Sequence, residues 1–105
     1  MHFLLIYDLA SDYLRRRLQF RDEHLALAWR AVEAGELLLG GAVEEPMDQA
    51  FLLFRGASPE AAARFAQEDP YVKNGLVREW RVKQWNTVVG EQAASPVRPQ
   101  SRPQS

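Results

Sequence analysis

The segment "ELLLGGAVEEPMDQAFLLFRG" (residues 36–56) decides the fold. Its two apolar runs are short and rich in residues that favour sheets, which predicts strands over 36–43 and 50–56. The intervening "EPMDQ" (45–49) has the composition of a turn, so the two strands are expected to form an antiparallel hairpin. The Gly-Gly pair within the first strand lacks the following helix that a phosphate-binding loop needs, and indicates a bulge or a close backbone approach.

One strand and one helix precede this hairpin. "HFLLIYD" (2–8) is apolar, aromatic and β-branched, and predicts a strand. Residues 11–35 predict a helix that ends at Gly35. The start of this helix could be a separate turn, which would place Asp22 and Glu23 in the first turn of the main helix, where the helix dipole favours acids.

A second helix and a last strand follow the hairpin. "SPEAAARFAQED" (58–69) predicts a helix with Ser58 as its N-cap and Pro59 at its first position, and the step from Asp69 to proline closes it. An Asn-Gly turn then leads into a final strand over 76–89.

The resulting order β-α-β-β-α-β predicts a ferredoxin-like fold of the α+β class, with two helices on one face of a four-stranded antiparallel sheet. The other face of such a sheet is normally polar. Here "FLLIY", "LLL" and "FLLF" are apolar at consecutive positions, so both faces of these strands are apolar. We therefore expect a homodimer formed through the second face. The alternative is a monomer whose second face holds a ligand pocket.

Length and composition restrict the classes of function. The chain has 105 residues, a net charge of −1 and no cysteine. Such a charge does not favour nucleic acid or membrane partners, and the absence of cysteine excludes thiolate nucleophiles and Cys-based metal sites. The apolar run near the N-terminus is too short for a signal peptide or membrane span, so a cytoplasmic location is expected.

The chain divides into two parts by composition. Residues 1–90 are expected to form one domain. "EQAASPVRPQSRPQS" (91–105) is rich in proline, glutamine and serine, contains one large apolar residue, and is expected to be a disordered tail.

A polar patch interrupts the apolar stripe of the first helix. Arg21 stands where the stripe should continue, and an arginine there is expected to have an anionic partner or to line a cavity. His24 follows one turn later, and Arg17, one turn earlier, would extend the patch if the helix is continuous. The predicted core stripe consists of Leu14, Leu18, Leu25, Ala28 and Val32.

Asp69 is the candidate partner of His24. A carboxylate that accepts from one imidazole nitrogen fixes the tautomer and leaves the other nitrogen free for a substrate. Tyr71 could offer a phenol donor or simply pack. Asp8, at the end of the first strand, could bind a ligand or cap the segment that follows.

Metal and cofactor motifs are missing from the sequence. His2 adjoins the initiator methionine, and His24 has no clustered ligands, so neither a metal site nor a cofactor is expected. Base stacking on the sheet would need a basic face, so RNA binding is not expected.

The chain resembles the YciI-like family of the dimeric α+β barrel superfamily. The resemblance covers about residues 2–90 and rests on Arg, two residues, His-Leu, a Gly-terminated helix, a small-residue strand and Asp-Pro-Tyr before a glycine. These are Arg21, His24, Leu25, Gly35, Gly41, Asp69, Pro70, Tyr71 and Gly75. Many relatives have Ala-Gly-Pro where this chain has "GGA" (40–42), at the expected pocket rim.

The resemblance implies a dimer and a pocket with a His24–Asp69 dyad, with Arg21, Tyr71, Asp8 and Gly41 as candidate substrate-binding residues. Proton transfer on small cyclic or aromatic molecules is within the family's chemistry. The leading hypothesis is a cofactor-free enzyme that uses His24 as general acid/base for elimination, isomerisation or dehydrochlorination. The alternatives are a protein that binds or senses a small ligand without catalysis, and a haem-handling or cofactor-free oxygenase relative.

Overall fold

A computed structural model of the chain describes residues 1–100. In chain order the elements are β1 (His2–Leu9), α1 (Tyr13–Glu33), β2 (Leu37–Ala42), β3 (Gln49–Arg55), α2 (Glu60–Glu68), α3 (Pro70–Lys73) and β4 (Val77–Trp85). The predicted ferredoxin-like α+β order is therefore confirmed. The short helix α3 is an addition that the sequence did not predict, because the proline that ends α2 also begins α3.

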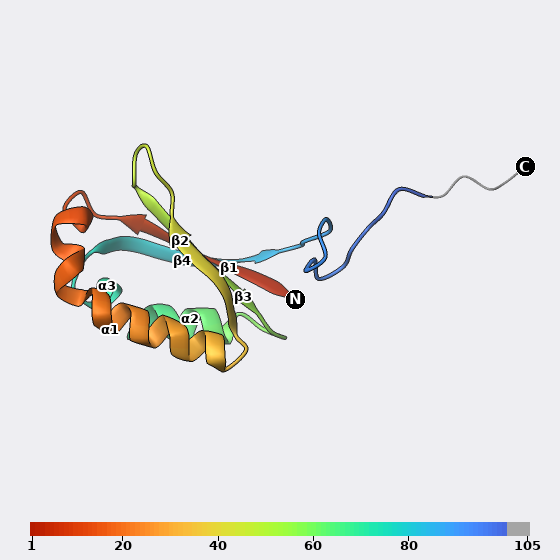
Figure 1. Cartoon of the computed structure of the whole chain (residues 1–105), viewed down its shortest axis with the longest axis horizontal. Coiled ribbons are helices and arrows are strands. Elements are labelled where there is room, and N and C mark those ends of the chain that lie inside the picture. The colour runs from red at the N-terminus through yellow and green to blue at the C-terminus, as the bar shows by residue number, and fades with distance from the viewer. Residues whose placement is uncertain (101–105) are drawn as a thin grey trace, which may run out of the picture.

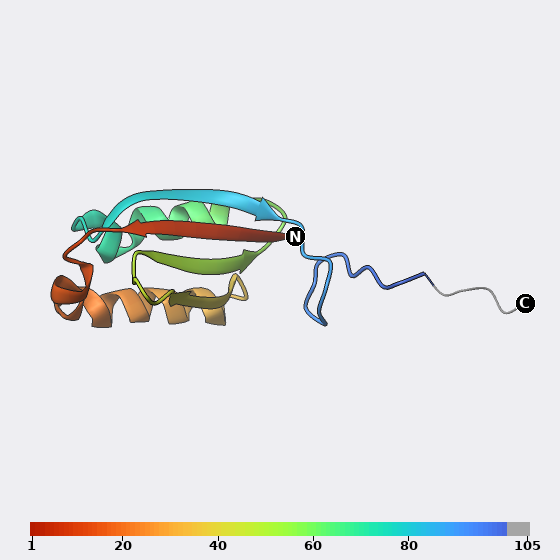
Figure 2. The ribbon, with the colours of Figure 1, turned by 90° about the horizontal axis from the view of Figure 1, so that it is seen from above.

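The four strands form one antiparallel sheet in the order β2-β3-β1-β4. Both long helices lie on the same face of it (Figure 1). Helix α1 runs along β2, whereas α2 contacts β1 and β4, so each helix covers one half of the sheet (Figure 2).

The core lies between the helices and one face of the sheet. The alternation along β1 turns Leu5, Tyr7 and Leu9 toward the helices, and all three are buried. Leu52 and Phe54 of β3 are buried on the same face. The irregularity predicted at the Gly-Gly pair occurs earlier, where the register of β2 shifts between Leu37 and Leu39.

Helix α1 is continuous, so of the two possibilities for its start the separate first turn is not the one that occurs. Asp22 and Glu23 consequently lie in the middle of the helix. The helix ends as predicted, because Gly35 has a positive φ of 78° and the Glu36 N–H donates to the Ala31 carbonyl at 3.0 Å. This bond belongs to the Schellman motif, in which a left-handed glycine ends a helix.

The predicted core stripe of α1 is right at Ala28 and Val32, which pack against the core, and wrong at its three leucines. Tyr13 and Ala31 are buried, and Phe20 and Leu27 pack against the core. His24 falls in the same row at helical spacing, so its side chain belongs to the face that meets the sheet. Much of the predicted stripe is exposed instead, at Leu14, Leu18 and Leu25.

Strand β4 is shorter than predicted and ends at Trp85. Trp85 pairs with His2, the first residue of β1, so no partner strand exists beyond this point. Residues 86–100 contain no helix or strand, although the Val97 N–H donates to the Val88 carbonyl at 2.8 Å. The final five residues of the predicted tail (91–105) lie outside the described residues. Within residues 1–100, no helix is long and apolar enough to span a membrane.

The second face of the sheet carries an apolar centre. Leu4 pairs with Leu53 and Ile6 with Phe51, and these positions alternate with the residues that face the helices. The edge strand β4 contributes charge to the same face, because Lys83 and Arg81 are the partners of Leu4 and Ile6.

Candidate active site

Asp69 stands at the junction of α2 and α3. Its extended ψ of 122° ends α2, and its side chain caps α3 by accepting from the Tyr71 backbone N–H at 3.0 Å. The residue is fully buried. A buried carboxylate is costly unless hydrogen bonds compensate for the lost water, so its partners determine what Asp69 can do.

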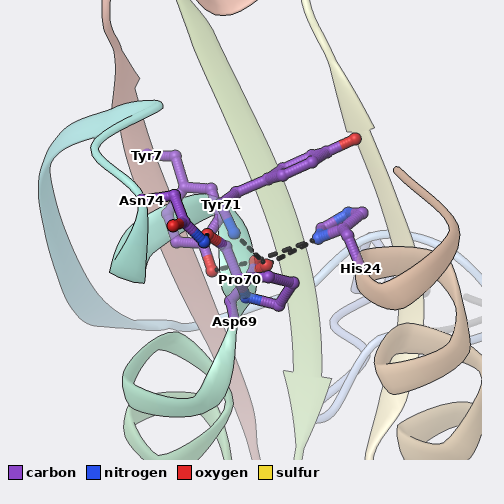
Figure 3. A network of polar contacts seen from close by, with 6 residues as sticks. All are labelled: Tyr7, His24, Asp69, Pro70, Tyr71 and Asn74. Carbon is purple, nitrogen blue, oxygen red and sulfur yellow. Dashed lines mark hydrogen bonds and ion pairs between the residues drawn. The ribbon is translucent and has the colours of Figure 1, made fainter. Parts of the chain in front are cut away.

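Two side chains complete the shell around this carboxylate (Figure 3). The Tyr7 hydroxyl donates to Oδ2 at 2.7 Å. The Nδ1 atom of His24 lies 2.9 Å from Oδ1 and 3.0 Å from Oδ2. Three elements distant in sequence, β1, α1 and the α2–α3 junction, therefore meet at Asp69.

This arrangement sets the tautomer of His24. An unprotonated carboxylate only accepts, so Nδ1 must carry the hydrogen that it shares with Asp69. The neutral ring then has a lone pair on Nε2, which makes no hydrogen bond within residues 1–100. His24 is thus held by one nitrogen and left free at the other.

Tyr71 lies flat against His24. The two ring centroids are 4.0 Å apart with an interplanar angle of 8°, and the Tyr71 hydroxyl points away from Asp69 (Figure 3). Burial raises the pKa of Tyr71 to about 12, assisted by Tyr13 and Asp69 and opposed by the Arg21 and Arg17 cations. The hydroxyl therefore remains a hydrogen-bond donor over the ordinary pH range.

The pKa of Tyr7 is also raised. Burial is the main cause, and the charge of Asp69 and the hydrogen bond to it act in the same direction. Tyr7 therefore serves as a permanent donor to Asp69 and not as a base.

A cavity of about 360 Å³ adjoins the His24 ring, between α1 and the β2 side of the sheet. His24, Arg21 and Tyr71 line it, as does Arg17. Gly41, the strand partner of Phe51, also lines the cavity. As a glycine, it contributes backbone atoms only. The rest of the lining is mostly apolar and includes Leu25, Ala28, Trp29, Val32, Leu37 and Leu52.

The structure does not bring Asp8 to this cavity. Asp8 lies on the opposite face of the sheet, where Arg81 donates to it at 2.8 Å and Gln49 at 2.9 Å. These hydrogen bonds lower the pKa of Asp8. Asp8 is directed away from the cavity because alternation along a strand sends adjacent residues to opposite faces, and Tyr7 is the one directed inward.

Sequence reasoning missed one residue of the site, Tyr7. Tyr7 shares the inward phase of Leu5 and Leu9, which could have marked it as a buried hydroxyl that needs a partner. Arg17, expected to extend the polar patch if the helix is continuous, lies one turn before Arg21 in the continuous α1 and lines the cavity. Residues 1–100 contain no group of three side chains suited to hold a metal ion.

Fold and site together define a ferredoxin-like α+β protein with a His–Asp contact beside a largely apolar cavity. The chain belongs to the family of the YCII-related domain, whose model matches residues 1–86. No curated protein matches the chain significantly.

Solved structures share the fold at low sequence identity. The 5-chloro-2-hydroxyhydroquinone dehydrochlorinase of Burkholderia phenoliruptrix AC1100, solved with 2,5-dihydroxybenzoquinone, matches with a TM-score of 0.69 and 23% identity over 83% of this chain and 95% of that one. A NIPSNAP-like domain protein of Burkholderia xenovorans matches with a TM-score of 0.54 and 20% identity, over 97% of this chain and 94% of that one. Protein Atu4242 of Agrobacterium tumefaciens matches with a TM-score of 0.55 and 14% identity, over 89% of this chain and 96% of that one.

Proposed function

We propose that this protein is a cofactor-free enzyme that moves protons on a small cyclic or aromatic compound, with His24 as general acid/base. The observation that carries the proposal is the contact of His24 Nδ1 with the buried Asp69, which leaves Nε2 for a ligand in the cavity. A positioned imidazole of this kind contributes roughly 10²- to 10⁴-fold to a proton transfer.

Each residue has a defined task in this scheme. His24 Nε2 takes a proton from the substrate, and the released electron pair forms a double bond as a leaving group such as chloride departs. Asp69 orients the ring and stabilises its charged form. Arg21 and the Tyr71 hydroxyl hold the substrate oxygen on which negative charge develops. In an isomerisation, His24 returns the proton at a different atom.

The structural neighbour with a known reaction supports this choice. That protein is a dehydrochlorinase of a chlorinated hydroxyhydroquinone, an elimination on a small ring compound. At 23% identity the likeness establishes the fold alone, so the reaction comes to this chain only as part of the proposal.

We also infer that the protein is a homodimer formed through the second face of its sheet. The apolar centre at Leu4, Ile6, Phe51 and Leu53 supports this, because the two long helices both cover the opposite face.

Turnover in variants of the two histidines tests the function. Chlorinated hydroquinones and related cyclic enols are screened as substrates with wild type, His24→Gln and, as matched control, His2→Asn. The His24→Gln amide can still donate to Asp69 but cannot accept and return a proton. Loss of turnover in His24→Gln alone supports the proposal.

Full activity in His24→Gln would refute a general acid/base role. Tight ligand binding without turnover by wild type would instead favour the alternative of a non-catalytic small-ligand protein.

A further inference from the structure

The lining of the cavity changes character along α1. Arg17 and Arg21 line it from the N-terminal half of the helix and His24 from its middle, whereas Ala28 and Val32 line it from the C-terminal half. Fifteen residues separate Arg17 from Val32, and a rise of 1.5 Å per residue makes this about 22 Å. One end of the cavity is therefore cationic and the other end is hydrocarbon.

Neither arginine at the cationic end has a carboxylate partner within residues 1–100. The Arg17 guanidinium lies over the Tyr13 ring at 5.8 Å, and its Nη1 is 3.8 Å from the Met47 sulfur. Both contacts leave the charge uncompensated. Tyr71 lines the same cavity as the two arginines, so three hydrogen-bond donors border it. Such a set favours a ligand with an anionic oxygen group.

The hydrocarbon end continues well beyond these donors. Leu37 of β2 and Leu52 of β3 form buried walls there, and Trp29 and Leu39 are largely exposed beside them. Gly40, which pairs with Leu52, lines the cavity with backbone atoms alone.

The volume exceeds the needs of a single ring. An apolar cavity of about 150 Å³ is enough for benzene, whereas this one measures about 360 Å³. A one-ring ligand held by the arginines would not contact the apolar side chains of Val32 and Leu37.

We propose that the ligand is an amphipathic anion larger than one ring, with a carboxylate or similar oxyanion on Arg17 and Arg21 and an apolar substituent extending along Ala28 and Val32 to Leu37. This inference rests on the proposed function in taking the cavity beside His24 as the substrate site. It adds Arg17 as a specificity-determining residue and assigns the class of compound to be tested.

Calorimetric binding of three probes to wild type tests the class of ligand without any turnover. The probes are benzoate, para-butylbenzoate and para-butylbenzyl alcohol. Each fully buried methylene contributes about fourfold to affinity, so we expect para-butylbenzoate to bind at least about tenfold more tightly than benzoate. The neutral alcohol should bind at least about tenfold more weakly than the para-butyl acid, because it cannot use the two cations.

Matched variants locate the two ends. Arg17→Gln and Arg21→Gln should each weaken para-butylbenzoate binding at least about fivefold, whereas Arg15→Gln should not, since Arg15 is exposed, pairs with Asp12 and does not line the cavity. Ala28→Leu should remove the advantage of the butyl group, so that this variant binds para-butylbenzoate no more tightly than benzoate.

Equal affinity for the two acids, equal affinity for acid and alcohol, or no binding of any probe would overturn the inference. So would an effect of Arg15→Gln as large as those of Arg17→Gln and Arg21→Gln. If binding follows the expected order but no substrate is turned over, the proposed function fails and the ligand class stands. If one-ring compounds without an apolar substituent are turned over and the butyl group brings no gain in affinity, the proposed function stands and the inferred ligand class fails.

Discussion

The imidazole of His24 and the phenol ring of Tyr71 stack with centroids 4.0 Å apart, while His24 Nδ1 and the Tyr71 backbone N–H both reach the same oxygen of Asp69. Tyr71, the residue after Pro70, thus supplies a backbone donor to the Asp69 carboxylate and an aromatic ring that stacks on His24. The ring of His24 is fixed in its plane by the stack and in its rotation by Asp69.

Tyr71→Phe separates the two contributions of this residue. The variant keeps the stack and removes the hydroxyl, so stability should change little while kcat/KM falls by about tenfold, as expected for one lost hydrogen bond to the substrate. Tyr71→Leu is the companion variant, and it should also lower stability because the aromatic pair is lost. Unchanged kinetics in Tyr71→Phe would assign Tyr71 to packing alone.

Tyr7→Phe tests whether the inner hydroxyl supports Asp69. A buried acceptor left without one of its donors costs about 1–3 kcal/mol, so the free energy of unfolding measured with denaturant should fall by that amount. Tyr13→Phe is the matched control, because the Tyr13 hydroxyl makes no hydrogen bond within residues 1–100. Equal stability of both variants would mean that the Tyr7–Asp69 bond contributes nothing net.

Alkaline pH should destabilise the protein through its buried tyrosines. Burial raises the pKa of Tyr71 from 10.0 to about 12 and raises that of Tyr7 further. The unfolded chain therefore releases both protons first. The stabilising effect of Tyr71 is complete below pH 10 and is lost as the pH rises through about 12. Denaturant unfolding at increasing pH should show this decline, and Tyr71→Phe should show a smaller one. A decline of the same size in Tyr71→Phe would exclude Tyr71 as a source.

Phe51→Lys tests the proposed dimer. A charge at the apolar centre of the second sheet face should convert a dimer into a monomer in sedimentation experiments, with the helical circular dichroism unchanged. Leu18→Lys is the control, because Leu18 is 77% exposed on the helix side of the molecule. Dissociation by Leu18→Lys and not by Phe51→Lys would move the interface to α1.

The order of elements could be predicted from the sequence because each element has its own periodicity and its own stop signal, such as Gly35 and the Asp69–Pro70 step. The rotation of α1 could not, because two rows of this helix are apolar. One row contains Leu14, Leu18 and Leu25, and the other contains Tyr13, Phe20, Leu27 and Ala31. Only contact with the sheet determines which row is buried.

The candidate site was predictable to a similar degree. Arg21 stood out because it interrupted an apolar stripe, and His24 because it follows Arg21 by one turn. Asp69 stood out because it ends a helix before a proline. The inward direction of Tyr7 and the outward direction of Asp8 depend on the phase of a strand that is apolar at consecutive positions, where alternation gives no signal. The short helix α3, which delivers the Tyr71 N–H to Asp69, is too short to produce a periodic pattern.

The central claim is that Asp69 holds His24 with the hydrogen on Nδ1 and leaves Nε2 free. Nitrogen-15 NMR of the imidazole rings measures this directly at a pH where the rings are neutral. The comparison uses wild type and Asp69→Asn, and His2→Asn assigns the signals of the two histidines.

The account predicts the Nδ1–H tautomer for His24 in wild type and a shift toward Nε2–H in Asp69→Asn, because the new amide can donate to Nδ1. Wild type in the Nε2–H form, or the same tautomer mixture in both proteins, would contradict the account and leave Asp69 as the cap of α3 alone.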